Sequence, residues 1–248
     1  MNFELSSLFG VLVIDKPAGP TSHDVVAAAR RALAIDRIGH TGTLDPLATG
    51  VLALVVGKAT RLASLLTASE KEYLARVRFG ATSETYDAEP GAIRGGTGPA
   101  PADRAAVAAA LPAFVGTYLQ QPPPFSAKKV AGVPAYKLAR RNQPVEIKPA
   151  QVTVGSLELV DYAEGVASLR LACSSGFYVR SLAHELGQRL GCGAYLDGLI
   201  RTRAGEFLLA DAVPLSLVMS DPAAATERMI GADRLLLELP SATLTDEA

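Results

Sequence analysis

Hydrophobic and polar positions along the chain follow two periods, one typical of strands and one typical of helices. Continuous apolar runs and two-residue alternation predict strands over residues 10–15, 50–57, 73–79, 151–160 and 166–173. Apolar residues at helical spacing predict helices at about residues 22–33, 62–66, 102–111, 134–141 and 179–190. Thr21 or Ser22 is expected to cap the first of these helices, and Pro134 suits the first turn of the fourth.

The order of these elements determines the expected fold class. Strands and helices alternate, but without the regularity of a doubly wound parallel fold. We therefore expect an α+β fold in which helices flank a mixed, largely antiparallel sheet. The segment 88–101 is rich in glycine, proline and alanine, and it predicts a flexible surface loop.

Length, composition and charge exclude several classes of protein. The 248 residues suffice for one large domain or two small ones, and the net charge of −1 counts against an indiscriminate nucleic-acid binder. The two cysteines, Cys173 and Cys192, and three scattered histidines form neither a disulfide framework nor a zinc motif. We therefore expect a cytoplasmic protein without a bound metal. The apolar run 9–14 is too short for a signal peptide or a membrane span.

Positive charge is concentrated in one stretch, residues 128–148. The stretch holds a single acid, Glu146, against the basic residues Lys128, Lys129, Lys137, Arg140, Arg141 and Lys148. Such a run is most often a solvated face, although a local basic surface can also serve specific binding of a nucleic acid. Charge alone leaves both interpretations open.

The most unusual composition lies in residues 39–50, where three glycines, three threonines and a proline surround a single acid, Asp45. The segment predicts a loop that precedes the second strand. Asp45 followed by proline is compatible with an ordinary turn. Catalytic groups also concentrate on structured loops, and the flanking Leu44 and Leu47 would limit solvation of the carboxylate. Asp45 is therefore a candidate catalytic group as well as a candidate turn residue.

A second cluster supplies a candidate partner for this carboxylate. Residues 173–182 read CSSGFYVRSL, so that Tyr178 and Arg180 are expected at the start of the last predicted helix. Arginine is always charged and can hold a carboxylate through two parallel hydrogen bonds. An Asp45–Arg180 pair would keep the carboxylate ionised and oriented, as a nucleophile requires. The two residues are far apart in the sequence, so spacing leaves this pairing a hypothesis.

Five segments of the chain carry a resemblance to a known family. They are residues 15–22 (DKPAGPTS), 39–50 (GHTGTLDPLATG), 71–73 (KEY), 121–128 (QPPPFSAK) and 176–180 (GFYVR). In this order and at similar spacing, these segments resemble those of the bacterial tRNA pseudouridine-55 synthases, the TruB family. Shorter matches at 191–194 and 199–201 extend the resemblance, which covers about residues 9–215. The pattern around Asp45 is highly specific, and the chain is identified as a member of this family.

The resemblance implies the pseudouridine synthase catalytic fold and an enzyme that flips the T-loop uridine out of tRNA and isomerises it to pseudouridine. It implies that no metal or cofactor takes part. The catalytic residues that it implies are Asp45 as the nucleophile, Arg180 as its partner and Tyr73, which would stack on the target ring and assist proton transfer.

The same resemblance implies a set of substrate-binding residues. His40 would fill the gap left by the flipped base, and Tyr73 would contact the ring. Tyr178 and Leu199 would line the uracil pocket, and Lys16 and Lys128 would contact phosphates.

The resemblance also divides the chain into regions. It implies a catalytic domain over residues 1–240, with a mobile basic insertion at about 121–150 that closes over the RNA. Residues 241–248 would be a tail, and the C-terminal RNA-binding (PUA-like) domain of many members would be absent. The expected partner is the T-arm of tRNA, bound by a monomer that can also assist tRNA folding.

Two alternative functions remain for comparison. The first is a non-catalytic RNA-binding protein on the same scaffold, which the presence of Asp45, Tyr73 and Arg180 argues against. The second is a glycoside hydrolase, because an aspartate nucleophile at an anomeric carbon would serve both reactions. Such enzymes usually need a second carboxylate. No second acid lies in the segments 39–50 or 174–180, and Glu84 and Asp87 are only remote candidates.

Overall fold

The structure is a computed structural model that describes residues 9–101, 103–126, 128–130, 132–139, 141 and 147–237. Its strands are β1 (Gly10–Lys16), β2 (Ile38–His40), β3 (Thr49–Val56), β4 (Lys71–Phe79), β5 (Ala81–Ser83), β6 (Ile93–Gly95), β7 (Gly116–Gln120), β8 (Lys129–Val130), β9 (Val133–Pro134), β10 (Ala150–Ala163), β11 (Val166–Cys173), β12 (Ala194–Ala204), β13 (Phe207–Leu208), β14 (Val213–Pro214) and β15 (Ile230–Gly231). Its α-helices are α1 (Ser22–Leu33), α2 (Ala63–Thr67), α3 (Arg104–Ala110), α4 (Ala135–Ala139), α5 (Val179–Arg189), α6 (Leu215–Ser220) and α7 (Pro222–Thr226). All the strands and helices expected from the pattern are present, with bounds that differ by a few residues.

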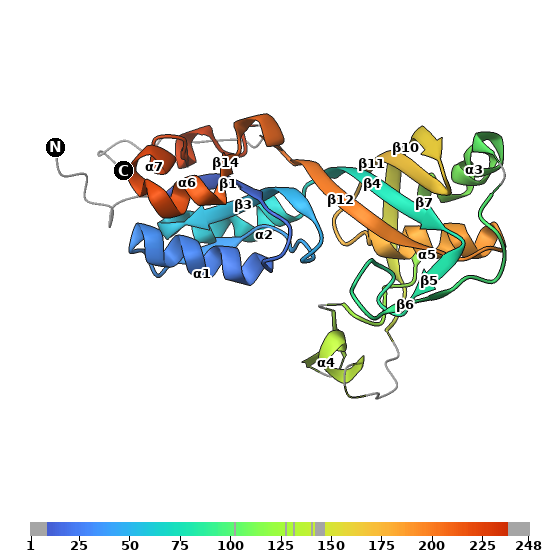
Figure 1. Cartoon of the computed structure of the whole chain (residues 1–248). Helices are drawn as coiled ribbons and strands as arrows, with labels where there is room; N and C mark the ends of the chain where they lie inside the picture. The colour runs from blue at the N-terminus through green and yellow to red at the C-terminus, as the bar shows by residue number, and fades with distance from the viewer. Residues whose placement is uncertain are drawn as a thin grey trace, which may run out of the picture.

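One mixed sheet organises the molecule, in the order β14-β1-β3-β12-β4-β11-β10-β7. Among the described strands of this sheet, the pairs β1–β14 and β3–β12 are parallel, and the other pairs are antiparallel. Figure 1 shows β1, β3 and β14 with α1, α6 and α7 on one side, and β4, β7, β10 and β11 with α3 and α5 on the other. The long strand β12 runs between the two groups. The prediction of a largely antiparallel α+β fold is confirmed.

The continuous apolar run of β3 is explained by burial on both faces of the sheet. Leu52 and Leu54 belong to the large core that α1 and α5 cover, whereas Val51 and Val55 belong to a smaller core with Leu66 and Phe207 on the opposite face. Strands buried on both sides require apolar residues at every position rather than at alternate ones. Alternate residues of β3 thus contribute to two hydrophobic cores, one on each face of the sheet.

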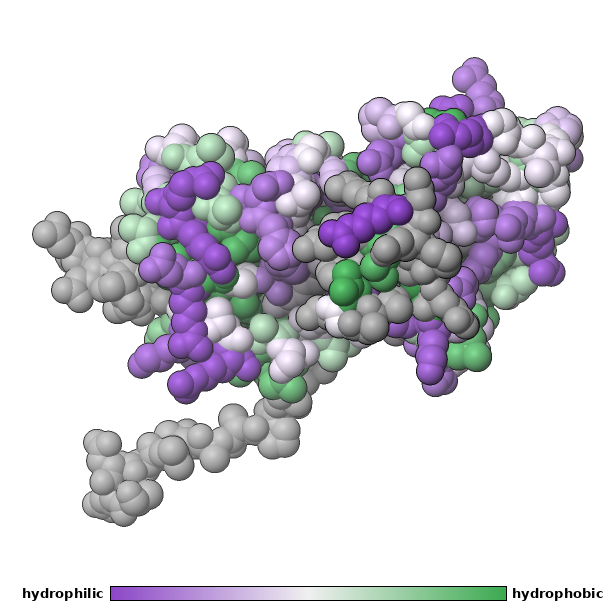
Figure 2. All heavy atoms as spheres, turned by 90° about the horizontal axis from the view of Figure 1, so that it is seen from below, coloured by the Kyte–Doolittle hydropathy of each residue, from purple (hydrophilic) through white to green (hydrophobic). Residues whose placement is uncertain are grey.

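Helix α1 is amphipathic and begins with a capping box. The side chain of Thr21 accepts a hydrogen bond from the backbone nitrogen of Asp24, and the Asp24 carboxylate accepts one from the backbone of Thr21. Between the two residues that the sequence offered as a cap, the structure therefore selects Thr21. The buried face carries Val25, Ala29 and Leu33. The opposite face is hydrophilic, and Figure 2 shows hydrophilic side chains gathered over this part of the molecule.

Two predicted loops contain strands, so those predictions are wrong in part. Within the expected loop 39–50, Gly39 and His40 belong to β2 and Thr49 and Gly50 to β3, which leaves 41–48 as the loop. Within the expected flexible loop 88–101, β6 pairs with β5. In both cases the pairing strand supplies hydrogen bonds that local composition does not reveal. Glycine-rich segments can join a sheet where another backbone approaches closely.

The segment predicted as a basic insertion contains the short hairpin β8–β9 followed by α4, and Figure 1 shows α4 apart from the rest of the fold. Arg140 and Glu146, which contribute to the predicted charge run, lie outside the described residues, as do residues 1–8 and the predicted tail 241–248. No helix in the described part of the chain is long and apolar enough to cross a membrane.

The sheet aligns four residues of different strands in one row. Lys16 of β1 pairs with Gly50 of β3, Gly50 pairs with Arg201 of β12, and Arg201 pairs with Tyr73 of β4. Gly50 has φ +94°, and a Cβ atom at this position would collide with the carbonyl oxygen of Arg201. Only glycine allows β3 and β12 to approach this closely.

We expect Gly50→Ala to lower the free energy of unfolding by about 3 kcal/mol, because the methyl group adds a backbone clash to left-handed strain. The matched control is Gly91→Ala. Gly91 has φ +80°, but no heavy atom lies within 4 Å of the place that an alanine Cβ would take, so only the strain, about 1 kcal/mol, remains. Urea denaturation of both variants measures the difference. Equal losses would show that the approach of β12 imposes no constraint at Gly50.

Candidate active site

The loop 41–48 is fixed by hydrogen bonds from the first two elements of the fold. The Ser22 hydroxyl donates to the carbonyl oxygen of Leu44 at 3.1 Å and accepts from the Leu44 nitrogen at 2.8 Å. The nitrogen of Gly19 donates to the carbonyl oxygen of Pro46 at 2.8 Å. Ser22 is fully buried, so these bonds form away from water. The backbone on either side of Asp45 is therefore held to the β1–α1 region.

Lys16 contributes to the same support. Its side chain is 0 % exposed, and its Nζ atom donates to the carbonyl oxygens of Pro17 at 2.8 Å, Ala48 at 2.7 Å and Pro46 at 3.4 Å. Burial lowers the pKa of this ammonium to about 8, and the nearby Asp45 charge opposes that effect. All three hydrogen-bond donors of this ammonium are directed at backbone carbonyl oxygens, and the phosphate contact expected of Lys16 stays a prediction. Lys16 holds the loop that carries Asp45.

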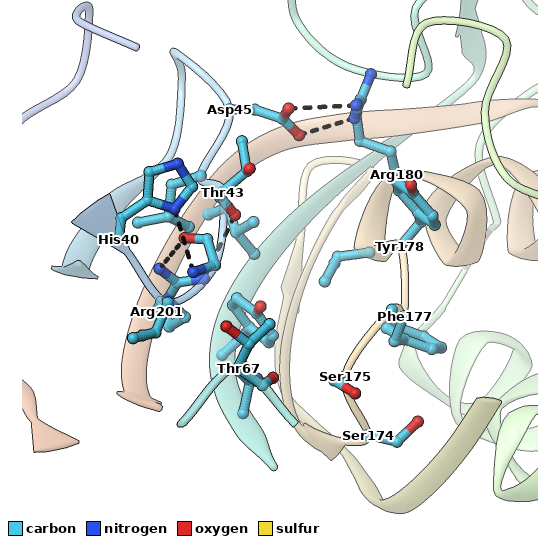
Figure 3. Close-up of a pocket in the computed structure, with 18 of the residues that line it drawn as sticks. His40, Thr43, Asp45, Thr67, Ser174, Ser175, Phe177, Tyr178, Arg180 and Arg201 are labelled. Atoms are coloured by element: carbon cyan, nitrogen blue, oxygen red, sulfur yellow. Dashed lines mark hydrogen bonds and ion pairs between the residues drawn. The ribbon is translucent and has the colours of Figure 1, made fainter. Parts of the chain in front are cut away.

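Asp45 and Arg180 form a two-point ion pair at the mouth of a cavity (Figure 3). Arg180 Nε lies 2.9 Å from Asp45 Oδ2, and Arg180 Nη2 donates to Asp45 Oδ1 at 3.2 Å. The Arg180 side chain is 7 % exposed, whereas that of Asp45 is 32 % exposed. The predicted pair is confirmed, and its carboxylate keeps one side open to the cavity.

The start of α5 places Arg180. Tyr178 is the N-cap residue of this helix, and its backbone is hydrogen-bonded to the side chain of Gln120, the last residue of β7. The Gln120 side chain accepts from the Tyr178 nitrogen at 2.9 Å and donates to the Tyr178 oxygen at 3.0 Å. The Ser181 hydroxyl donates to the carbonyl oxygen of Gln121 at 2.7 Å. The bond to the Tyr178 nitrogen satisfies a donor that a helix start leaves free, and all three bonds help to fix the start of α5 and with it the guanidinium.

A second acid, Asp87, lies beside the same guanidinium. Arg180 Nη1 is 3.8 Å from Asp87 Oδ2 and donates to the carbonyl oxygen of Thr85 at 3.0 Å. The Thr85 hydroxyl donates to Asp87 Oδ1 at 2.6 Å. The interpretation of Asp87 as a remote acid is therefore wrong. Its only sequence signal was a polar segment after a predicted strand, and the approach to Arg180 depends on tertiary structure.

Opposing effects set the protonation of Asp45. Burial raises the pKa of this carboxyl group and is the largest effect. The Arg180 charge lowers the pKa, the Asp87 charge raises it, and the Lys16 ammonium lowers it again. The guanidinium is thus the main group that favours the ionised form of Asp45 against desolvation.

The cavity has a volume of about 380 Å³ and brings most of the predicted site residues together. Its lining includes His40, Asp45, Tyr73, Tyr178, Arg180 and Leu199. Figure 3 shows Asp45 and Arg180 facing each other at one end, with Thr67, Ser174 and Ser175 at the other. Lys128 is not among the lining residues, and its Nζ atom donates to the carbonyl oxygen of Lys148 at 2.9 Å within the insertion.

Arg201 is a buried site residue to which the sequence assigned no role. Its Nε atom donates to the carbonyl oxygen of Val51 at 2.7 Å, and its Nη2 atom donates to that of Gly42 at 3.0 Å. Burial raises the pKa of the Tyr73 phenol, and the neighbouring Arg201 lowers it through charge and a side-chain hydrogen bond. Arg201 therefore links Tyr73 to the loop that carries Asp45.

His40 lies at the edge of the cavity in a neutral form. Its Nδ1 atom accepts from the Gly42 nitrogen at 3.2 Å, and its ring meets that of His23 edge to face at 5.6 Å. Burial lowers the pKa of His40, and the charges of His23 and Arg201 lower it further. A neutral ring whose Nδ1 accepts carries its proton on Nε2, which leaves a donor for a ligand.

A second cavity of about 710 Å³ is also lined by Asp45 and Arg180. Its lining includes His23, Pro46, Asp87 and Phe125. The ion pair thus borders both cavities. Within the described residues, no group of three His, Cys, Asp or Glu side chains is arranged to hold a metal ion.

Comparisons with known proteins agree with this geometry. Residues 30–179 match the model of the TruB family pseudouridylate synthase (N terminal domain). The chain is 45 % identical over 223 residues to a tRNA pseudouridine synthase B of Opitutus terrae, a match that covers 90 % of this chain and 92 % of the relative. It is 43 % identical to that of Symbiobacterium thermophilum over 250 aligned residues, which cover 100 % of this chain and 82 % of the relative.

A solved structure shares the fold. A chain of the Cbf5-Nop10-Gar1 complex superposes with a TM-score of 0.66 and 30 % sequence identity, over 88 % of this chain and 56 % of that chain. The fold and the family match together define the class as the pseudouridine synthase catalytic fold. Within that class, the chain belongs to the TruB family of pseudouridylate synthases.

The charges of Arg180 and Asp87 shift the pKa of Asp45 in opposite directions. We expect Arg180→Met to raise the pKa of Asp45, because a stabilising positive charge is lost, and Asp87→Asn to lower it, because a repelling negative charge is lost. The carboxyl carbon shift of Asp45, followed by NMR across the titration, measures both. Arg94→Met is the control, since Arg94 forms an exposed pair with Glu84. Shifts of the same sign in both site variants would contradict this account.

Proposed function

We propose that this protein isomerises a uridine in the T-loop of tRNA to pseudouridine, with Asp45 as the nucleophile. The proposal depends on one observation above all. An aspartate within the TruB family match is paired at two points with a buried arginine, and its open side faces a cavity lined by tyrosines and a leucine. The names of the relatives as tRNA pseudouridine synthase B support tRNA as the substrate.

The reaction exchanges one bond to the ribose for another. The N1–C1′ bond of the uridine breaks, the base turns, and a C5–C1′ bond forms, while C5 loses a proton and N1 gains one. The substrate and product are isomers, so atoms and electrons balance without a co-reactant. Attack by the carboxylate at C1′ or at C6 requires the ionised form of Asp45. The ion pair with Arg180 favours the ionised carboxylate against desolvation and orients it toward the cavity.

The aromatic residues act on the base in this proposal. The cavity of about 380 Å³ lies inside the fold, so the nucleotide must leave its stack in the RNA to enter it. The Tyr73 ring would stack on the uracil, which replaces part of the lost stacking, and its phenol would assist proton transfer. Tyr178 and Leu199 would confine the detached base while it turns. The Nε2 donor of His40 would meet the RNA at the edge of the cavity.

The basic insertion is proposed to hold the RNA outside the cavity. Segment 121–126 passes over the site, where the carbonyl oxygen of Phe125 accepts from Arg180 Nη2 at 3.0 Å. Lys128 follows directly and would contact a phosphate. Because this segment joins the insertion to the site, closure of the insertion on RNA would change the contact between Phe125 and Arg180. Contacts of this kind supply affinity that depends on salt.

The remaining expectations belong to the same proposal. We propose a monomer that acts in the cytoplasm on the T-arm of tRNA without a metal or other cofactor, and that can assist tRNA folding through the same RNA contacts. The division into a catalytic domain over residues 1–240, an insertion at about 121–150 and a short tail remains a prediction.

The decisive experiment is release of tritium from an unmodified tRNA transcript that carries uridine labelled at C5. Formation of the C5–C1′ bond must expel this hydrogen, so we expect release by the wild-type protein in the presence of a chelator. Asp45→Asn keeps the shape of the side chain but removes the nucleophilic charge, so we expect tRNA binding without release. Binding without release in the wild type would favour the RNA-binding alternative, and free uracil would favour a glycosidase.

Asp87 should matter for turnover although it does not face the smaller cavity. We expect Asp87→Asn to lower the single-turnover rate by roughly 100-fold, because a loosened guanidinium misplaces the nucleophile, while tRNA affinity stays within about twofold. Glu84→Gln is the matched control, since this acid lies three residues earlier and is 58 % exposed. A rate for Asp87→Asn equal to that of Glu84→Gln would exclude Asp87 from the mechanism.

A further inference from the structure

Tyr86 lies between Thr85 and Asp87, the two residues of the segment 85–87 that contact Arg180, and its backbone conformation is unusual. Its φ of +64° is in the left-handed region, which glycine favours and bulky side chains rarely adopt. Its neighbours are Thr85, whose carbonyl oxygen accepts from Arg180, and Asp87, whose carboxylate faces the same guanidinium. Such backbone strain persists only where other contacts impose it, so the surrounding structure must hold Tyr86 in place.

The ring of Tyr86 is stacked on His184 of helix α5. The ring centroids are 3.8 Å apart, and the planes differ by 5°. His184 follows Arg180 by four residues on α5, so both side chains leave the helix on the same face. One face of α5 therefore contacts three consecutive residues of the segment, Thr85 and Asp87 through Arg180 and Tyr86 through His184.

Contacts on either side hold the stack. Gln188, one further turn along α5, has its side-chain amide nitrogen 2.8 Å from His184 Nε2. On the other side, the Leu196 nitrogen of β12 donates to the carbonyl oxygen of Tyr86, and the Ala88 nitrogen donates to that of Leu196, both at 3.0 Å. Burial lowers the pKa of His184 and raises that of Tyr86, so both rings are neutral near neutral pH. Two neutral planar rings stack without the cost of desolvating a charge.

We infer that the Tyr86–His184 stack is a positioning device for catalysis. It holds the segment 85–87 in its strained conformation against α5, and the segment in turn holds the Arg180 guanidinium that orients Asp45. Tyr86 and His184 do not touch the nucleophile, and they act through Thr85 and Asp87. The inference rests on the proposed function for its effect on turnover, but its effect on Arg180 can be measured without substrate.

Tyr86→Gly separates positioning from stability. Glycine relieves the left-handed strain but removes the ring, so we expect little change in the thermal midpoint, roughly tenfold or more loss of the single-turnover rate, and unchanged tRNA affinity. Tyr86→Phe and His184→Phe retain a planar ring and should restore most of the rate. Glu164→Gly is the control, because Glu164 also has positive φ, 51°, but lies in the turn between β10 and β11. It should leave the rate unchanged.

A double-mutant cycle tests the route of the effect. Because Tyr86 acts through Asp87 as well as through Thr85, Tyr86→Gly should cost clearly less in an Asp87→Asn background than in the wild type. Hydrogen exchange at Arg180 Nε, followed by NMR in the absence of RNA, should quicken in Tyr86→Gly and not in Tyr86→Phe. Losses that multiply, or exchange at Arg180 that does not change in Tyr86→Gly, would overturn the inference. Because the exchange measurement needs no turnover, it stands even if the proposed reaction fails.

Discussion

The constraint on which the site depends is the removal of a carboxylate and a guanidinium from water. A buried ion pair is stable only if its geometry is good and the remaining donors of the arginine are satisfied. The two Nη atoms of Arg180 donate to the carbonyl oxygens of Thr85 and Phe125 and to Asp45 Oδ1, while Nε lies 2.9 Å from Asp45 Oδ2 and Asp87 adds a second carboxylate. Residues from three regions of the chain, Asp45, the segment 85–87 and Phe125, contact this one side chain. Loss of any one of these contacts would leave the buried Arg180 guanidinium with an uncompensated donor or charge.

The sheet provides the frame for this convergence. The row formed by Lys16, Gly50, Arg201 and Tyr73 crosses strands β1, β3, β12 and β4 at one level. From this row, Lys16 and Arg201 reach the loop 41–48 from two directions through its carbonyl oxygens. The loop that carries Asp45 is consequently rigid although it has neither helix nor strand. A catalytic carboxylate must be held in this way, because small displacements reduce the rate strongly.

The strands and helices could be predicted because they follow from the local periodicity of hydrophobic residues. The Asp45–Arg180 pair could be predicted because a specific family pattern marks both residues. The sequence does not reveal contacts that depend on distant backbone. Three backbone carbonyl oxygens surround the Lys16 ammonium, and Asp87, in the sequence only a remote candidate for a second carboxylate, lies beside Arg180. The role of Gly50 follows from the closeness of β12, which no local pattern reveals. Buried polar partners form through tertiary contacts, and residue types alone do not identify them.

The parallel pairing of β3 with β12 has a consequence for the order in which the protein acquires its site. Arg201 and Val51, which share a hydrogen bond, are 150 residues apart in the chain. During synthesis, the loop that carries Asp45 leaves the ribosome long before Arg180 and Arg201 exist to hold it. Contacts of such high sequence separation form late and slowly, because a large loop must close first. The newly made N-terminal part therefore exposes a carboxylate without its partners, and the chemistry of the site begins only when the final third of the fold has docked.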